Sequence, residues 1–184
     1  YDPERRVWVV DESQHQFFVF SNDGSELLHT FGEKGVQGND ETHLAGPQDV
    51  AFTPDGRVLV ADGFINGRVM ILDADLNYIT EFGGESGSGR GRFDVVHSIA
   101  VGPDGRIFVA DRNNRRVQVF NEAGEYVLHL GGSAIELSMW QKRYVEASPD
   151  IVKARRRVQT LEPETKFALP TSVRFDVARN RLYV

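Results

Sequence analysis

The sequence contains no cysteine, which excludes disulfide bonds and thiolate metal sites within its 184 residues. It also lacks any apolar run near the roughly 20 residues that a membrane-spanning helix needs, so we expect no membrane span. Basic residues are outnumbered, because 21 lysines and arginines face 27 aspartates and glutamates, for a formal net charge of −6. This balance argues against nucleic acid as a main partner, since nucleic-acid-binding domains carry basic surfaces.

Familiar catalytic signatures are missing as well. No arrangement of residues resembles a Ser-His-Asp or Cys-His system. The glycine-rich stretch 83–89 follows an expected strand but opens no helix, so it does not fit a phosphate-binding loop. The sequence begins at Tyr1 with no signal-like apolar segment, and we expect that it comes from within a longer protein.

Two stretches that nearly copy each other are the main feature that is present. Residues 50–72 and 99–120 both run through an apolar stretch, a Pro-Asp-Gly turn, a second apolar stretch, an Asp-led turn and a third apolar stretch. Asp-Gly pairs between apolar runs are hairpin signals, because glycine adopts a positive φ at little cost. Self-similarity over a long period indicates a repeat architecture.

Each full repeat offers four strands. Residues 46–83 and 97–131 are the full repeats, residues 1–32 resemble a repeat without its first strand, and a further repeat opens at Pro170. The strands expected in the first full repeat are 50–52, 58–61, 68–72 and 78–82. Equivalent positions lie at Val9, Val60, Val109 and Val184, which are separated by 51, 49 and 75 residues.

The last interval is longer than the others, and the excess falls in residues 132–168. Leu137, Trp140 and Tyr144 recur there at helical spacing. Ser148 and Pro149 then supply an N-cap and a proline at the first helical position. The pattern predicts an inserted helical hairpin, which we expect either to cover a binding face or to decorate the surface.

Four short antiparallel strands in a repeat of about 50 residues suit a blade of a β-propeller. Leucine-rich repeats are shorter and ankyrin repeats are helical, while a β-sandwich would leave the repeated register unexplained. We therefore predict an all-β fold in which residues 1–184 are part of one propeller domain, with two full and two partial blades. The positions expected to be buried are Val58, Val60, Ile107, Val109, Val117 and Val119.

The run PDGRIFVADRNNRRVQVF at 103–120 resembles an NHL repeat. The resemblance covers residues 1–131, resumes at 169–184, and implies a propeller of six blades. Among NHL families, the greatest similarity is to the peptidyl-α-hydroxyglycine α-amidating lyases, whose propeller holds a metal through histidines at its centre.

The lyase resemblance implies roles for three positions. His97 is similar to a zinc-binding histidine, and Arg112 is similar to an arginine that binds the substrate. Phe64 stands where the family has its catalytic tyrosine, which departs from lyase chemistry. The two other zinc histidines would fall outside residues 1–184. The resemblance thus implies zinc as a cofactor and favours an exported protein over a cytoplasmic one.

The predicted blades bring these positions together. In an up-and-down blade, the first strand begins at the sheet end where the second strand finishes, so His97, Phe64 and Arg112 belong on one axial face. Gln48 and Thr171 are equivalent to His97 and should lie beside it. Purely structural roles stay open for two of these residues: His97 as a hydrogen-bonded side chain at the start of a strand, and Arg112 as the ion-pair partner of a nearby aspartate.

Two functions from different classes fit this sequence. The first is a non-catalytic propeller that binds a small molecule, a peptide or a protein on its axial face, with Arg112, Phe64, Gln48 and Thr171 as contacts. The second is a zinc-dependent lyase that cleaves a C–N bond, with His97 as a metal ligand and Arg112 on the substrate carboxylate. The missing tyrosine favours the binding scaffold.

Overall fold

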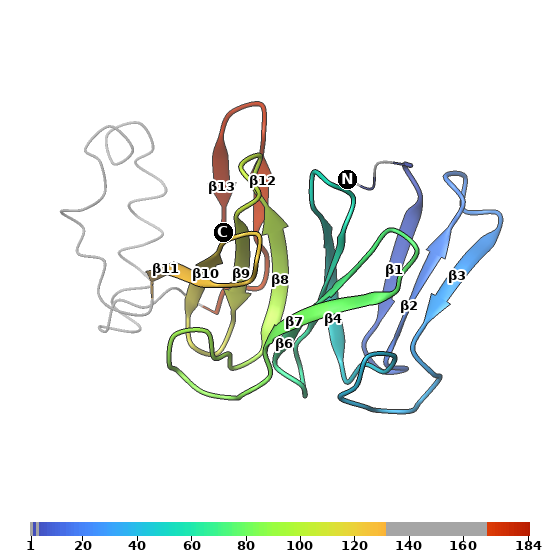
Figure 1. The fold of residues 1–184 in the computed structure, drawn as a ribbon, viewed down its shortest axis with the longest axis horizontal. Coiled ribbons are helices and arrows are strands. Elements are labelled where there is room, and N and C mark those ends of the chain that lie inside the picture. Colours follow the sequence, from blue (N-terminus) through green and yellow to red (C-terminus); the bar gives the residue numbers. More distant parts are fainter. Residues whose placement is uncertain (1, 3, 132–168) are drawn as a thin grey trace.

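The computed structural model describes residue 2, residues 4–131 and residues 169–184, which form thirteen strands and no helix (Figure 1). The strands are β1 (Val7–Asp11), β2 (Gln16–Phe20), β3 (Leu27–Phe31), β4 (Pro47–Phe52), β5 (Val58–Asp62), β6 (Arg68–Leu72), β7 (Tyr78–Gly83), β8 (Val96–Val101), β9 (Ile107–Asp111), β10 (Arg116–Phe120), β11 (Tyr126–Gly131), β12 (Arg174–Asp176) and β13 (Arg181–Tyr183). The predicted all-β class is confirmed for these residues. The helical hairpin expected at 132–168 lies outside the described part of the chain.

The strands form four antiparallel sheets, each in sequence order. The two full repeats give the four-stranded sheets β4-β5-β6-β7 and β8-β9-β10-β11. The first repeat gives β1-β2-β3, and the last gives the pair β12-β13. The four strands expected for each full repeat are therefore confirmed, although β4 begins three residues before the predicted start at residue 50.

Hairpin turns connect these strands where the sequence places Asp-Gly pairs. Gly56 and Gly105 adopt positive φ angles of 91° and 76°, which side chains with a Cβ rarely tolerate. In both turns the glycine N–H closes a backbone hydrogen bond of 3.0 Å, to Thr53 or to Gly102. The local sequence thus fixes the points at which the chain reverses.

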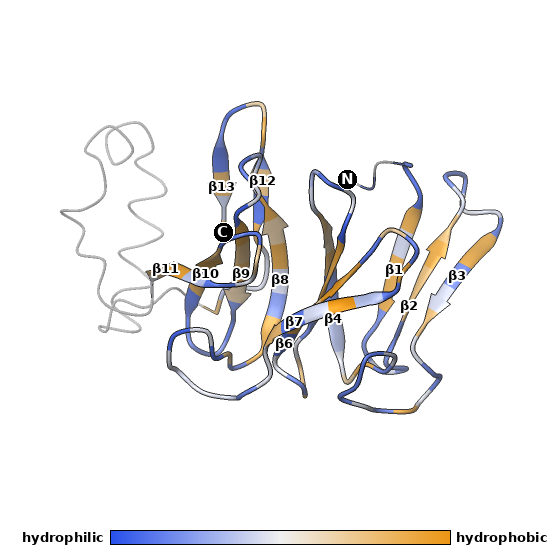
Figure 2. Ribbon diagram, viewed as in Figure 1, coloured by the Kyte–Doolittle hydropathy of each residue, from blue (hydrophilic) through white to orange (hydrophobic). Residues whose placement is uncertain are grey.

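Neighbouring sheets pack face to face, so their middle strands are buried on both sides. Figure 2 shows that hydrophobic residues are frequent along the strands of these sheets. Val58 and Val60 face the β1-β2-β3 sheet, whereas Leu59 and Ala61 face the β8-β11 sheet. This explains why β5 is buried at every residue instead of alternating between buried and exposed. The six positions predicted to be buried have exposures of 0–2%.

The inner strands of successive sheets lie beside one another. β4 contacts β8, and β8 contacts β12, while β1 packs against β4 (Figure 1). Each sheet is therefore placed like the blade of a propeller, with its first strand at the inside; the β1-β2-β3 sheet lacks that strand, and its β1 packs against β4 as β5 packs against β8. This arrangement brings one end of every inner strand to a common face.

Candidate functional site

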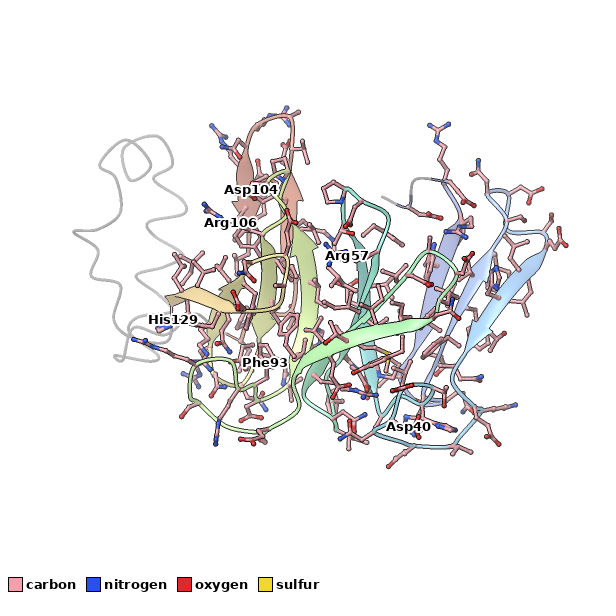
Figure 3. The ribbon with its side chains drawn as sticks, in the orientation of Figure 1. Asp40, Arg57, Phe93, Asp104, Arg106 and His129 are labelled. Carbon is pink, nitrogen blue, oxygen red and sulfur yellow. The ribbon has the colours of Figure 1, made fainter. Side chains whose placement is uncertain are left out.

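One end of the sheets carries the positions singled out in the sequence. Four segments meet there: the loop 33–46, the turn 63–67, the loop 84–95 and the turn 112–115, which we call the axial face. The hairpin turns 53–57 and 102–106 lie at the opposite end. Figure 3 shows this separation, with Asp40 at the axial face and Asp104 and Arg106 at the other end.

His97 lies on β8 at an irregularity in strand pairing. Val96 pairs with Asp111 and Ser98 with Ala110, which leaves His97 as the extra residue of a β-bulge. Gln48 occupies the same position in β4, between Pro47 and Asp49. Bulges re-aim side chains and recur beside active sites, so both side chains are turned out of the regular pleat.

A neighbouring backbone carbonyl fixes the orientation of the His97 ring. Its Nδ1 lies 2.9 Å from the carbonyl oxygen of Thr171. Because a carbonyl can only accept a hydrogen bond, Nδ1 carries a hydrogen, and in the neutral ring this leaves the lone pair on Nε2. Metal-binding histidines are oriented in this way by their second nitrogen. The expected neighbourhood of His97 and Thr171 is therefore observed.

Arg112 follows β9 at the edge of the same face. Its backbone N–H donates to Val95 at 3.0 Å, and its Nη1 donates to the Asn113 Oδ1 at 3.1 Å. The Nε is buried and has no hydrogen-bond partner among the described residues. Among the described residues, no aspartate forms a hydrogen bond or an ion pair with the Arg112 side chain. The pairing that the sequence left open is therefore not observed there. A buried guanidinium nitrogen without an acceptor is suited to an anionic group.

Phe64 and Ile65 present an apolar surface between these polar groups. Their backbone N–H groups donate to Gly46 and Ala45, which ties the turn to the start of β4. Their side chains are 49% and 57% exposed. Gln48 lies nearby but uses its Nε2 on the carbonyls of Gly46 and Pro47. The turn therefore offers stacking surface and no titratable group.

Two buried ion pairs hold the loops of this face in place. Arg68 Nε donates to Asp62 at 2.9 Å, and Arg116 Nε donates to Asp111 at 2.7 Å. Burial raises the pKa of both aspartates, although the arginines and neighbouring amide and backbone N–H donors act against that rise. The sequence shows an aspartate at the start of this turn in both repeats, and the signal that could have revealed its partner is the arginine that opens each third strand.

A second network, missed in the sequence, joins three inner strands directly beside His97. The Asp49 Oδ2 accepts hydrogen bonds from Ser98 Oγ at 2.7 Å, from the Ile99 N–H at 3.1 Å and from Arg174 Nη1 at 3.0 Å. Ser98 Oγ in turn accepts from the Val173 N–H at 3.1 Å. A cavity of about 480 Å³ runs along the same strands. This network fixes the spacing of β4, β8 and β12.

The described residues do not by themselves form a metal site. They contain no group of three His, Cys, Asp or Glu side chains arranged to hold an ion. A zinc ion bound at His97 would therefore need ligands from beyond the described ranges, since catalytic zinc takes about three protein ligands. Within those ranges there is also no helix that could cross a membrane.

Comparison with known proteins places this architecture among related chains. The family model described as NHL repeat matches residues 93–120. The chain is 32% identical over 130 residues to peptidyl-alpha-hydroxyglycine alpha-amidating lyase 1 of Drosophila melanogaster, covering 65% of this chain and 24% of that protein. It is 30% identical over 159 residues to NHL repeat-containing protein 3 of Homo sapiens, covering 82% and 42%.

The chain thus spans less than half of the length of these relatives. Among solved structures, Kuenenia stuttgartiensis hydrazine synthase matches with a TM-score of 0.52 at 18% identity, over 70% of this chain and 32% of that one. Identity at this level reflects a shared fold alone. The suspected similarity to NHL repeats and to the amidating lyases is confirmed.

Proposed function

We propose that this chain, which carries an NHL repeat at residues 93–120, is part of a β-propeller whose axial face is a binding scaffold for a ligand with a carboxylate or similar anionic group. In this proposal the chain supplies four blades or parts of blades to a six-bladed propeller. The remaining blades complete the axial face around His97, Arg112, Phe64, Gln48 and Thr171.

The buried Nε of Arg112 is the observation that carries the proposal. A buried donor without an acceptor costs about 1–3 kcal/mol, so an Arg112 side chain that turns its Nε toward an acceptor on the ligand regains that free energy on binding. An anionic acceptor is favoured over a neutral one, because hydrogen bonds between charged partners are roughly twice as strong. The backbone bond between Arg112 and Val95 holds the turn ready for this contact.

The residues of the turn 63–67 are consistent with a binding role. Phe64 has no group that could remove or deliver a proton, whereas its exposed ring can pack against an apolar part of the ligand. Catalysis at this position would thus require a base from elsewhere in the protein.

The test uses the complete protein and two forms of one peptide, with a free C-terminal carboxylate or a C-terminal amide. We expect the carboxylate form to bind at least about tenfold more tightly, and Arg112→Gln to abolish the difference. Arg106→Gln, an exposed arginine at the opposite end, is the matched control and should leave binding unchanged. Equal affinity for both peptides would overturn the proposal.

A second candidate is a zinc-dependent lyase acting on a peptidyl-α-hydroxyglycine. The orientation of His97 favours it, because the Thr171 carbonyl occupies Nδ1 and leaves Nε2 free to bind a metal. Zinc, when bound, would polarise the hydroxyl of such a substrate. Arg112 would hold the substrate carboxylate, and Phe64 would leave proton removal to another residue.

Metal analysis separates the two candidates. The complete protein is stripped with chelator, dialysed against zinc and assayed for metal content and for release of a peptide amide from its α-hydroxyglycine precursor. Stoichiometric zinc that is lost in His97→Ala, together with amide release, would establish the lyase. Zinc content near zero leaves the scaffold as the function of this face.

A further inference from the structure

The turns 63–67 and 112–115 occupy the same place in two successive repeats, and each is tied in the same way to the loop that precedes its repeat. In each turn, two successive backbone N–H groups donate to two carbonyls of that loop, at distances of 3.0–3.1 Å. The donors and acceptors are Phe64 and Gly46, Ile65 and Ala45, Arg112 and Val95, and Asn113 and Asp94. The backbone holds both turns, so the fold does not depend on which side chains stand at these positions.

In the turn 112–115, the side chains add two polar contacts that the turn 63–67 lacks. The Asn113 Nδ2 donates to the Asp94 Oδ1 at 3.0 Å, and the Arg112 Nη1 donates to the Asn113 Oδ1 at 3.1 Å. The residues at the equivalent positions of the other repeat are Ala45, Ile65 and Phe64. Their side chains have no polar atoms, and yet their turn has the same backbone bonds. The two added contacts therefore serve the Arg112 side chain and not the fold.

Both partners of Asn113 fix the orientation of its amide. A carboxylate accepts hydrogen bonds, so Asp94 faces the amide nitrogen. A guanidinium only donates hydrogen bonds, so Arg112 faces the amide oxygen. A flipped amide would lose both contacts, and the amide is thus held in a single orientation.

Asn113 occupies one nitrogen of the Arg112 guanidinium and leaves an edge of that group for a ligand. Nη1 is bonded to Asn113, whereas Nε has no partner among the described residues. Nε and Nη2 form an edge that can donate to both oxygens of a carboxylate at once. Because only Nη1 is held, the guanidinium can turn about this nitrogen, bring Nε to the ligand and keep its bond to Asn113. A side chain held in this way has less conformational entropy to lose on binding.

The loop residue that accepts the Arg112 N–H has an unfavourable backbone conformation. Val95 has a φ of 66°, in a region that β-branched residues rarely adopt. The equivalent residue of the preceding repeat is Gly46, which adopts a φ of 78° at little cost. Strain of this kind persists where surrounding contacts determine the backbone, and it clusters at ligand sites. The loop that carries Asp94 is therefore held in one conformation beside Arg112.

From these contacts we propose that Asn113, oriented by Asp94, is a positioning residue of the carboxylate site. It holds the Arg112 guanidinium by Nη1 and presents the edge formed by Nε and Nη2 to the ligand. The proposal rests on the carboxylate-binding function given above. It adds that the site recognises both oxygens of a planar carboxylate, and that Asn113 acts through Arg112 without touching the ligand.

The experiment measures the affinity of the complete protein for two labelled peptides of one sequence, which end in a carboxylate or in an amide. We expect Asn113→Ala to lower the ratio of the two affinities at least about fivefold, because the ligand must then order a loosened Arg112. Asp94→Ala should act in the same way, whereas Asp94→Asn keeps an acceptor for the Asn113 amide and should retain most of the ratio. The thermal midpoint of Asn113→Ala should stay within about 2 °C of wild type, since the backbone bonds remain.

The matched control is Asn121→Ala. The Asn121 amide also donates to a carboxylate, that of Glu125 at 2.8 Å, but it lies in a hairpin turn at the opposite end of the sheets. This variant should leave the ratio unchanged. An unchanged ratio in Asn113→Ala, or an equal loss of affinity for both peptides, would overturn the inference.

The wild-type protein and Arg112→Gln separate this failure from that of the proposed function. If the wild-type protein binds both peptides equally, the carboxylate-binding function itself is wrong. If Arg112→Gln abolishes the preference and Asn113→Ala leaves it intact, only the positioning role of Asn113 is wrong.

Discussion

Replacement of Arg116 by methionine tests how the axial face is held. Arg116 donates to Asp111 at 2.7 Å and to the carbonyls of Ser88, Gly89 and Arg92 at 2.8, 2.8 and 2.9 Å. Its side chain is 7% exposed and that of Asp111 is not exposed at all. Arg116→Met would keep most of the packed volume but remove every one of these bonds.

The expected cost is large because a buried charge loses its partner. Breaking a buried ion pair from one side destabilises a protein by about 3–5 kcal/mol. The Asp111 carboxylate would still accept from Asp94 N–H and Asn114, which argues for the lower part of that range. Replacing both partners, as Asp111→Asn/Arg116→Met, should recover at least about 1 kcal/mol, because no unpaired charge is then buried.

The same variant should respond to pH in a defined direction. Burial raises the pKa of Asp111 in the folded protein, and loss of Arg116 raises it further. A carboxyl with a raised folded-state pKa stabilises the protein most below its unfolded value of about 3.9, and this contribution is lost as pH rises through the folded value. The cost of Arg116→Met should therefore be greatest near neutral pH and should shrink toward pH 4.5.

Urea unfolding of wild type and variants at several pH values measures these free energies. Hydrogen exchange at the Arg112 N–H reports whether the loop 84–95 has loosened, since that N–H is bonded to Val95. Arg106→Met is the control, because Arg106 pairs with Asp104 at the surface and should contribute within about 1 kcal/mol. A cost for Arg116→Met no larger than that of the control, or a cost independent of pH, would refute the reasoning.

Three further outcomes are expected. Gly63→Ala should lower the free energy of unfolding by about 2 kcal/mol or more, because its new Cβ would lie 1.7 Å from the Val96 carbonyl oxygen; an unchanged thermal midpoint would contradict this. Asp49→Ala removes the acceptor shared by three donors on two neighbouring strands and should lower the free energy of unfolding in urea by about 2 kcal/mol. An unchanged free energy of unfolding would show that these donors do not depend on Asp49. Asp40→Asn should lower the pKa of His43, because the hydrogen bond from His43 to Asp40 raises that pKa. A raised histidine pKa stabilises the folded protein at acidic pH, and this contribution is lost as pH rises. The His43 pKa measured by NMR titration and the free energy of unfolding at acidic pH should therefore both decrease.

The sequence determined the strands and the core without help from tertiary structure. Apolar runs such as 58–61 and 107–110 are separated by Asp-Gly pairs, and the glycines Gly56 and Gly105 turn the chain with positive φ. These features are local, because hydrophobic pattern and turn geometry act over a few residues. The repeat made the prediction stronger, since one register had to fit every copy.

The sequence also placed His97, Phe64, Arg112, Gln48 and Thr171 at one end of the sheets, through the direction of strands in an up-and-down blade. The direct contact of His97 with the Thr171 carbonyl agrees with that placement. The roles of these residues stay predictions, and so do zinc and the six blades. The two helices predicted at 132–168 lie outside the described residues.

Only the tertiary structure decided how each side chain on the axial face is held. The bulges that turn out His97 and Gln48, the shared acceptor Asp49 and the unpaired Nε of Arg112 depend on strands that lie far apart in sequence. Ser98 and Arg174, for example, meet Asp49 across separations of 49 and 125 residues. Hydrogen bonds of this kind depend on positions within a few tenths of an ångström, and such distances exist only after the sheets have packed.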